Sequence, residues 1–209
     1  MPAIIAVVAL VVMGALAVQR FVADDGSVVG SEAGDVASSG GAGETSGKAR
    51  IGGPFHLVDH QGQTVTSATY SGQFMLIYFG YTFCPDICPT SLTTMSEALD
   101  LAGAAADNVQ PLFITVDPER DTVEHMAEYV GYFHPRLIGL TGSSEQVRQA
   151  AKAYRVYSAK VDEDENDPGA YLMDHSSIIY LMGPDGAFVH HFNHEATPED
   201  VAKKLKELT

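Results

Sequence analysis

The chain has 209 residues, of which 45% are hydrophobic and 19% are charged, and these proportions are typical of a folded chain with one core. Its 27 Asp and Glu residues outnumber its 12 Lys and Arg residues and give a net charge of −15 at pH 7. Because such an acidic chain repels polyanions, the composition excludes a nucleic-acid-binding protein and predicts cationic or neutral partners. The only cysteines are Cys84 and Cys88, which excludes a disulfide scaffold.

The N-terminal segment is apolar, since residues 2–18 contain no charged side chain. We expect residues 1–21 to form an uncleaved transmembrane anchor, which is short but can span a bilayer with tilt. A cleaved secretory signal is the alternative, because residues 15–17 have the small-x-small form of a cleavage site, although no Lys or Arg precedes the run. A buried core helix is disfavoured because no polar face interrupts the run. Either membrane reading exports the rest of the chain.

A flexible tether is predicted for residues 22–50, which are rich in Gly, Ser, Ala and acidic residues. The folded domain is then expected over residues 51–209, with a net charge of −13. The acidity therefore belongs to the domain and not to the tether.

The first half of the domain alternates strands and a helix. Residues 55–65 contain a glycine turn and predict a β-hairpin, and the apolar run at residues 74–81 is typical of a strand buried on both faces. A helix is expected to begin at Pro89, which suits the first helical position, and residues 111–116 predict a second buried strand. Because proline disfavours α geometry at the residue before it, we expect residues 84–88 to form a tight loop.

Two further helices are predicted in the middle of the domain. Asp121 with Glu124, and Ser143 with Gln146, have the spacing of capping boxes and should open these helices. A short third strand is expected between them, at residues 137–140.

The last part of the domain predicts a hairpin and a helix. Residues 176–192 place a Gly-Pro-Asp-Gly turn between two apolar runs, and Thr197 should cap the final helix. Strand, helix and strand, followed by helix, antiparallel hairpin and helix, is the order of an α/β thioredoxin-like fold, here with an added N-terminal β-hairpin.

The cysteine pair is the most informative feature of the sequence. Cys84 and Cys88 lie between a buried strand and a helix whose N-terminus faces them, so their sulfur atoms can converge for a disulfide or for two bonds to one metal ion. The helix dipole favours thiolate, which is both the nucleophile and the metal ligand. Two inert buried thiols are the alternative, which Asp86 between them, in a loop, disfavours.

A metal site at these thiolates needs a further ligand. Two thiolates select Cu(I) and Zn(II), and the third ligand is usually a histidine from elsewhere in the chain. We predict His175, because it stands directly before the first strand of the terminal hairpin, and that strand starts opposite the cysteine loop. The other histidines are expected to be structural, on the surface, or adventitious ligands: His56, His60, His125, His134, His190, His191 and His194.

Three segments give the sequence a resemblance to a known family. FGYTFCPDICPTSL (79–92), VDPERDT (116–122) and DHSSIIYLMGPDG (174–186) resemble the signature segments of the SCO/SenC copper chaperones, in matching order. These are membrane-anchored thioredoxin-like proteins that help assemble the binuclear copper site of cytochrome c oxidase. The resemblance extends from about Ile51 to the last helix.

The resemblance implies a ligand set and a redox couple. Cys84, Cys88 and His175 would bind Cu(I) in a trigonal site, and Cu(II) would add a fourth ligand. Oxidation of Cys84 and Cys88 to a disulfide would remove the site, so redox state and metal loading would be coupled. Asp174 beside His175, and Asp86 between the cysteines, are candidates for supporting groups around the ligands.

The function implied is a metallochaperone rather than an enzyme. It would receive copper from an upstream donor protein and pass it to the copper-accepting subunit of cytochrome c oxidase, while anchored on the outer, periplasmic side of a bacterial inner membrane.

Two enzyme-like alternatives stay open. A thiol-disulfide oxidoreductase is disfavoured by the three residues between the cysteines and by Asp174-His175-Ser176, which replaces the cis-proline of ordinary thioredoxins. A peroxidase-like sensor would need an arginine near one cysteine, and Arg120 is the only candidate.

One acidic segment is not explained by the family pattern. Residues 162–167, DEDEND, lead toward His175. They predict a solvated loop or, as the alternative, a docking surface for a basic partner that acts on association rate.

Overall fold

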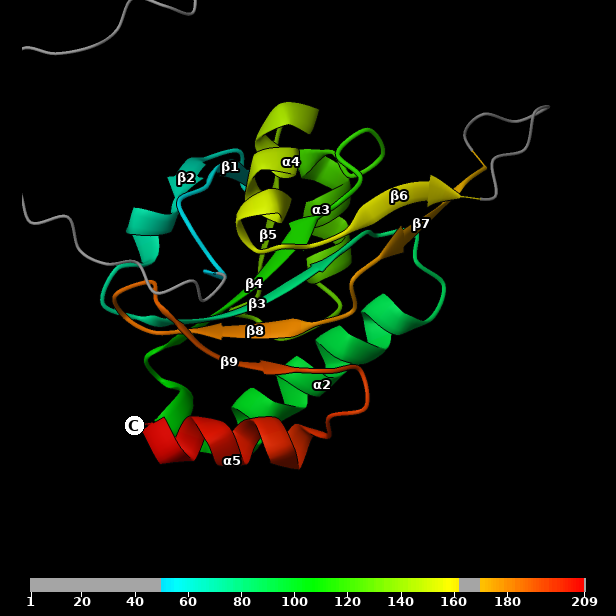
Figure 1. Ribbon diagram of the computed structural model, residues 1–209. Helices are drawn as coiled ribbons and strands as arrows, with labels where there is room; N and C mark the ends of the chain where they lie inside the picture. Colours follow the sequence, from blue (N-terminus) through cyan, green and yellow to red (C-terminus); the bar gives the residue numbers. More distant parts are fainter. Residues whose placement is uncertain (1–49, 162–169, 209) are drawn as a thin grey trace, which may run out of the picture. The chain divides into compact units, whose positions relative to one another are not determined.

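The structure is a computed structural model that describes residues 50–161 and 170–208 (Figure 1). The predicted anchor (1–21), the predicted tether up to residue 49 and the acidic segment (162–167) lie outside the described residues. Within the two described ranges, no helix is long and apolar enough to cross a membrane.

A seven-stranded sheet forms the centre of the domain. In chain order it contains β1 (His56–Asp59), β2 (Thr64–Thr66), β3 (Phe74–Gly80), β4 (Val109–Thr115), β5 (Ile138–Thr141), β8 (Ile179–Met182) and β9 (Phe188–Phe192). The order across the sheet is β2-β1-β5-β4-β3-β8-β9. β3, β4 and β5 run parallel, and the β8–β9 hairpin and the β1–β2 hairpin add antiparallel strands at the two edges.

The helices connect these strands and pack against the sheet. They are α2 (Ile87–Ala102), α3 (Val123–Val130), α4 (Ser144–Ala153) and α5 (Pro198–Leu208), together with the short 3-10 helices η1 (Ser67–Tyr70) and η2 (Gly103–Ala106). α2 and α5 lie side by side (Figure 1). The series β3, α2, β4, then the β8–β9 hairpin and α5, confirms the predicted thioredoxin-like order, and the β1–β2 hairpin is the predicted addition.

The core is built on the two faces of β3, which the continuous apolar run predicted. The Tyr78 ring stacks with Phe113, which in turn contacts Tyr129 on α3. On the opposite face Phe79 contacts the ring of Tyr154, which follows α4. Each side chain buried in this way contributes about 1.5–3 kcal/mol, so the sheet rigidly positions the loop that follows β3.

The start of α2 differs from its prediction. The helix begins at Ile87, so Cys88 is helical and not in the loop. Proline is tolerated in the first turn because the amide groups there have no acceptor within the helix, and this outweighs the preference of the residue before proline for extended geometry.

The start of α3 also differs, by one residue. Thr122 is the N-cap and its hydroxyl accepts a hydrogen bond from the amide of His125 at 3.3 Å, so the predicted cap at Asp121 is wrong. Asp121 is fully buried instead. The predicted capping box of Ser143 and Gln146 at α4 is confirmed.

A two-stranded ribbon was not predicted from the sequence. β6 (Ser158–Val161) and β7 (Leu172–His175) pair antiparallel, with Ser158 opposite His175, in a sheet separate from the main one (Figure 1). Their mostly exposed residues lack the alternating apolar pattern of a strand.

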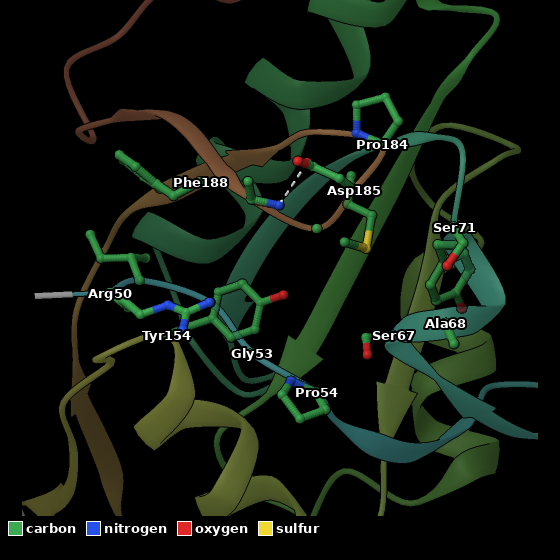
Figure 2. Close-up of a pocket in the computed structure, with 16 residues that line it drawn as sticks. Arg50, Gly53, Pro54, Ser67, Ala68, Ser71, Tyr154, Pro184, Asp185 and Phe188 are labelled. Carbon is green, nitrogen blue, oxygen red and sulfur yellow. Dashed lines mark hydrogen bonds between the residues drawn. The ribbon is translucent and has the colours of Figure 1, made fainter. Parts of the chain in front are cut away.

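A cleft of about 590 Å³ lies at the end of the sheet where β3 begins (Figure 2). It is lined by the chain around Gly53, by η1, by Tyr154 and by the turn at Asp185, whose carboxylate accepts a hydrogen bond from the amide of Ala187 at 3.0 Å. The cysteine loop follows the other end of β3, about 20 Å away for a strand of this length. The cleft therefore does not belong to the cysteine site.

Candidate metal centre

The two cysteines lie where β3 ends and α2 begins. Cys84 is in the loop and partly exposed, whereas Cys88 is in the first turn of α2 and completely buried. Cys88 fills the space above Gly80, where a Cβ atom would lie only 2.7 Å from its sulfur. Glycine at the end of β3 is thus required for Cys88 to occupy this position.

His175 reaches the cysteines from a distant part of the chain. It is the last residue of β7, and its Nε2 atom lies 3.4 Å from the sulfur of Cys88. Its Nδ1 atom lies 3.2 Å from the carbonyl oxygen of Ser176. Because a carbonyl only accepts, Nδ1 carries the proton and the lone pair of Nε2 faces the sulfur. The rings of Tyr78 and Tyr81 stand edge-on to the imidazole and hold its plane.

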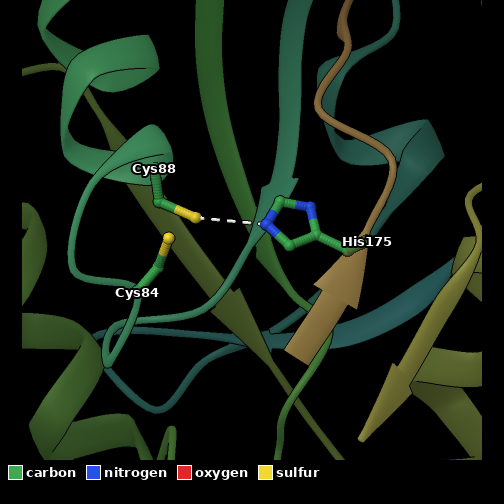
Figure 3. A group of neighbouring side chains, drawn as sticks. All are labelled: Cys84, Cys88 and His175. Atoms are coloured by element: carbon green, nitrogen blue, oxygen red, sulfur yellow. Dashed lines mark hydrogen bonds between the residues drawn. The ribbon is translucent and has the colours of Figure 1, made fainter. Parts of the chain in front are cut away.

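The three side chains form a group with the dimensions of a metal site (Figure 3). The sulfur atoms of Cys84 and Cys88 and one ring nitrogen of His175 all lie within 4.8 Å of one another. Metal–sulfur bonds of about 2.3 Å and metal–nitrogen bonds of about 2.0 Å separate the ligand atoms of a trigonal site by roughly 3.8 Å. Small movements would thus let one ion bind all three atoms. In residues 50–161 and 170–208 no other such group of three occurs.

The two thiols have opposite tendencies to ionise. The hydrogen bond from Cys88 lowers the pKa of the Cys84 thiol to about 3, helped by the backbone amides of Asp86 and Cys88, and burial opposes this. The same hydrogen bond and its own burial raise the pKa of Cys88 above the usual range. At neutral pH Cys84 is therefore the thiolate and Cys88 the protonated donor.

The two predicted supporting carboxylates are exposed. Asp86 is the N-cap residue of α2, but its side chain makes no capping hydrogen bond. Asp174 precedes His175 in β7, and because successive side chains of a strand point to opposite faces it does not face the imidazole. The structure places the carbonyl of Ser176, and not the carboxylate of Asp174, at the Nδ1 atom.

The remaining histidines lie elsewhere. His190 and His191 are neighbours on β9, and His134 lies 3.7 Å from Asp100. His60 accepts a hydrogen bond from the amide of Gly139, and the ring of His125 contacts that of Phe83 in a tilted arrangement. None of the histidines in the described part of the chain other than His175 joins a group of three possible ligands.

Arg120 forms a clamp that joins the cysteine loop to the strand of His175. From the sequence, this residue was a candidate only for a peroxidase-like site. Arg120 donates to the carboxylate of Asp117 at 2.5 Å and to the carbonyl of Tyr171 at 2.8 Å, and Tyr171 donates to the same carboxylate at 2.7 Å. Its guanidinium also lies 3.6 Å from the ring centroid of Tyr171 and 4.7 Å from that of Phe83. One cation thus contacts the residue before Cys84 and the segment that enters β7.

The buried carboxylate of Asp121 also supports the cysteine loop, through hydrogen bonds to Thr82. Asp121 accepts hydrogen bonds from the hydroxyls of Thr82 and Thr115 at 2.6 Å each and from the amide of Thr82. Burial raises the pKa of Asp121, and these hydrogen bonds oppose the rise. Nothing in the sequence indicated that Asp121 is buried, because its spacing from Glu124 predicted a helix cap.

The chain resembles known proteins in both sequence and fold. A family model described as SCO1/SenC matches residues 43–209. The chain is 47% identical over 156 residues to the mitochondrial SCO2 homologue of Danio rerio, covering 74% of this chain and 55% of that protein. It thus spans about half the length of this mitochondrial relative.

Two solved structures are similar across the domain. Bradyrhizobium japonicum ScoI with copper bound has 48% identity and a TM-score of 0.69, covering 75% of this chain and 98% of that chain. BsSco, described as having a disulfide switch and as a member of the Sco family of cytochrome c oxidase assembly proteins, has 26% identity and a TM-score of 0.59, covering 76% of this chain and 92% of that chain. With the family match over most of its length and with the fold in common, this chain belongs to the SCO1/SenC family.

Proposed function

We propose that the protein is a copper chaperone that holds one copper ion through Cys84, Cys88 and His175. It would pass the ion to the binuclear copper site of cytochrome c oxidase. The observation that carries the proposal is the convergence of two sulfur atoms and one unprotonated ring nitrogen within 4.8 Å. Membership of a family with copper-bound structures supports copper over zinc as the cargo.

The arrangement suits transfer by exchange of ligands. Two soft thiolates and one imidazole favour Cu(I) in a three-coordinate site, to which Cu(II) would add a ligand. Cys84 is the partly exposed thiolate, so a ligand of the partner would replace it first, and buried Cys88 would leave last. Binding of copper would also require Cys88 to lose its proton, which couples loading to proton release.

The setting of the domain is part of the proposal. Residues 1–21 would anchor the chain and residues 22–50 would tether the domain on the outer, periplasmic side of a bacterial inner membrane. An upstream donor protein and the copper-accepting subunit of the oxidase would then meet it at the membrane surface.

Copper titration of the full, reduced chain under anaerobic conditions tests the ligand set. We expect one Cu(I) per chain, with affinity measured by competition with a chelator. Removal of groups that only support a ligand costs 10–100-fold, so we expect His175→Ala to weaken binding by more than about 100-fold. His191→Ala, an exposed histidine on β9, is the matched control and should bind as the wild type does. Unchanged affinity in His175→Ala, or tight stoichiometric copper in Cys84→Ser, would contradict the assignment.

A thiol-disulfide oxidoreductase is the second candidate, favoured by the ionised Cys84 beside the protonated Cys88. In this reaction the Cys84 thiolate attacks a substrate disulfide and the Cys88 thiol then displaces the substrate. A disulfide forms in the chaperone and two electrons pass to the substrate sulfurs, which take one proton from Cys88 and the other from water. Such chemistry would reduce the cysteines of the oxidase copper site or signal redox state.

Insulin reduction separates the two candidates. We expect slow turnover, because a thiolate with so low a pKa is a weak nucleophile and stabilises the reduced form of the pair. The assay would follow insulin precipitation with thioredoxin as reference and Cys84→Ser as the inactive control. Turnover comparable to thioredoxin would make the oxidoreductase the first function.

A further inference from the structure

A small pocket lies beside the cysteine loop, on the side of α3. It has a volume of about 180 Å³ and is lined by Thr82, Phe83, His125, Glu128, Tyr129 and Tyr132. Phe83 directly precedes Cys84, so the wall of this pocket is one residue from the thiolate. The volume suits the end of a single side chain.

The pocket is assembled from two segments. Residues 125, 128, 129 and 132 recur at helical spacing, so α3 and the turn after it present them on one side. The loop contributes Phe83, whose ring centroid is 5.2 Å from that of His125. Burial raises the pKa of Tyr129, and the electrostatic influence of the cysteine pair adds to this rise, so the pocket lies near the thiols.

Two aromatic rings of this pocket are exposed to a ligand. Phe83 is 45% exposed and Tyr132 is 75% exposed. Large aromatic residues are usually buried, so their exposure beside the cysteine loop is unusual. The hydroxyl of Tyr129 is buried and has no hydrogen-bond partner among the described residues. Exposed aromatic surface and an unpaired buried hydroxyl together are typical of a binding site.

The charge around the pocket is negative. The carboxylate of Glu128 lies 3.5 Å from the hydroxyl of Tyr132, and Glu124 lies one turn earlier on α3. Neither α3 nor residues 81–86 contain a Lys or Arg. Arg120 packs on Phe83, but its charge is met by Asp117. Aromatic rings with a carboxylate at their edge are the combination that binds an organic cation.

We propose that this pocket, which we call the cation pocket, receives an arginine side chain of the protein that exchanges copper with Cys84. The inference rests on the proposed copper function for the identity of the partner. The planar guanidinium stacks on aromatic rings and pairs with a carboxylate, which an ammonium group does less well. An arginine held there places the adjoining residues of the partner over the Cys84 thiolate, and the acidic domain steers the basic partner toward it.

A titration of the metal-free, reduced, isotope-labelled full chain tests the pocket directly. The probes are N-acetyl-argininamide and its neutral isostere N-acetyl-citrullinamide, and the readout is the NMR shifts of residues 82, 83, 125, 128, 129 and 132. We expect saturable shifts at these residues with the arginine probe and at least about fivefold weaker binding of the citrulline probe. Equal binding of both probes would indicate an apolar pocket and overturn the proposal, as would shifts that do not map to these residues.

Two variants make the test specific. Glu128→Gln should weaken binding of the arginine probe at least about fivefold while leaving the fold and the thiols unchanged. Glu97→Gln removes an exposed carboxylate on α2 outside the pocket and should leave binding unchanged. An equal loss of affinity in both variants would show that the probe responds only to the overall negative charge, and would overturn the proposal. Because this titration contains no copper, its result stands even if the copper function fails.

A transfer assay connects the pocket to copper exchange. In this assay the copper-loaded full chain is mixed with the copper-accepting oxidase subunit. We expect Glu128→Gln to lower the second-order rate constant of copper transfer at least about fivefold, with copper affinity unchanged. The wild-type rate in Glu128→Gln would overturn the role in docking. Failure of the wild type to bind copper would instead refute the proposed function.

Discussion

Cys84 and Cys88 have identical side chains and opposite surroundings. Cys84 sits in a partly exposed loop where hydrogen bonds stabilise its negative charge, whereas Cys88 is enclosed by the sheet and by α2. The two cysteines therefore differ in role: Cys84 is the accessible thiolate, and Cys88 is the buried, protonated thiol. Neither property follows from the spacing of the cysteines, because both depend on which one the first turn of α2 buries.

Alkylation as a function of pH tests this order. Because the pKa of Cys84 is lowered to about 3, we expect iodoacetamide to modify Cys84 alone, at a rate that is constant from pH 5 to 7 and falls only as the pH approaches 3. Mass spectrometry of the reduced, metal-free chain gives the site and the rate. In Cys88→Ala the strongest stabilising hydrogen bond is lost, so the inflection should move toward the ordinary thiol value of about 8.5. A wild-type inflection near that value would contradict the assignment.

His175 shows how far residue-level prediction extends. Its position before the terminal hairpin indicated that it faces the cysteines, and the structure brings them together. The hydrogen bond that orients its ring was not predictable, because a backbone carbonyl such as that of Ser176 carries no signal in the sequence. Asp174, which the sequence offered instead, is directed away by the alternation of the strand.

At the scale of elements, the site joins a rigid loop to a ribbon outside the main sheet. The two cysteines lie at the junction of β3 and α2, while β7 carries His175 and belongs to a separate two-stranded sheet. The contacts of Arg120 with Phe83 and Tyr171 form one bridge between these two elements.

Arg120→Gln tests the bridge. Removing the guanidinium leaves the carboxylate of Asp117 without its cation and frees the entry to β7, so His175 should be less well oriented. We expect copper affinity to fall about 10–100-fold, the usual cost of losing a group that orients a ligand. Arg120→Lys restores the charge but not the planar contacts and should recover only part of the affinity. Competition with a chelator measures the loss, and circular dichroism checks the fold; wild-type affinity in Arg120→Gln would contradict a role for the clamp.

Elements with strong apolar patterns were predicted well, and those without were not. The apolar runs at β3, β4 and β8 are buried on both faces, and their composition predicted strands. β6 and β7 are mostly exposed, so their pairing depends on tertiary contacts such as that of Arg120 and was missed. The start of α2 was misplaced because the preference of Cys88 for extended geometry before a proline was outweighed by the tolerance of proline in the first turn of a helix.

At the scale of the whole molecule, copper should act as a stabilising ligand. An ion that binds only the folded chain adds about 4 kcal/mol of stability at a thousandfold excess over its dissociation constant. For a domain of this size, each kcal/mol raises the melting temperature by about 2–4 °C, so we expect a rise of about 8–16 °C on loading with Cu(I). Differential scanning calorimetry under anaerobic conditions measures the shift, and a chelator should reverse it. A shift of equal size in His175→Ala would show that copper binds elsewhere.

The separation of the ligands along the chain has a consequence for how the protein matures. Cys88 and His175 are 87 residues apart, and strands β4 and β5 of the main sheet and most of the β6–β7 ribbon are synthesised between them. A nascent chain that has been synthesised only as far as the cysteines carries two exposed thiols and lacks the third ligand. Copper acquisition must therefore follow translation and folding, and until then the thiols depend on a reducing environment to remain unpaired.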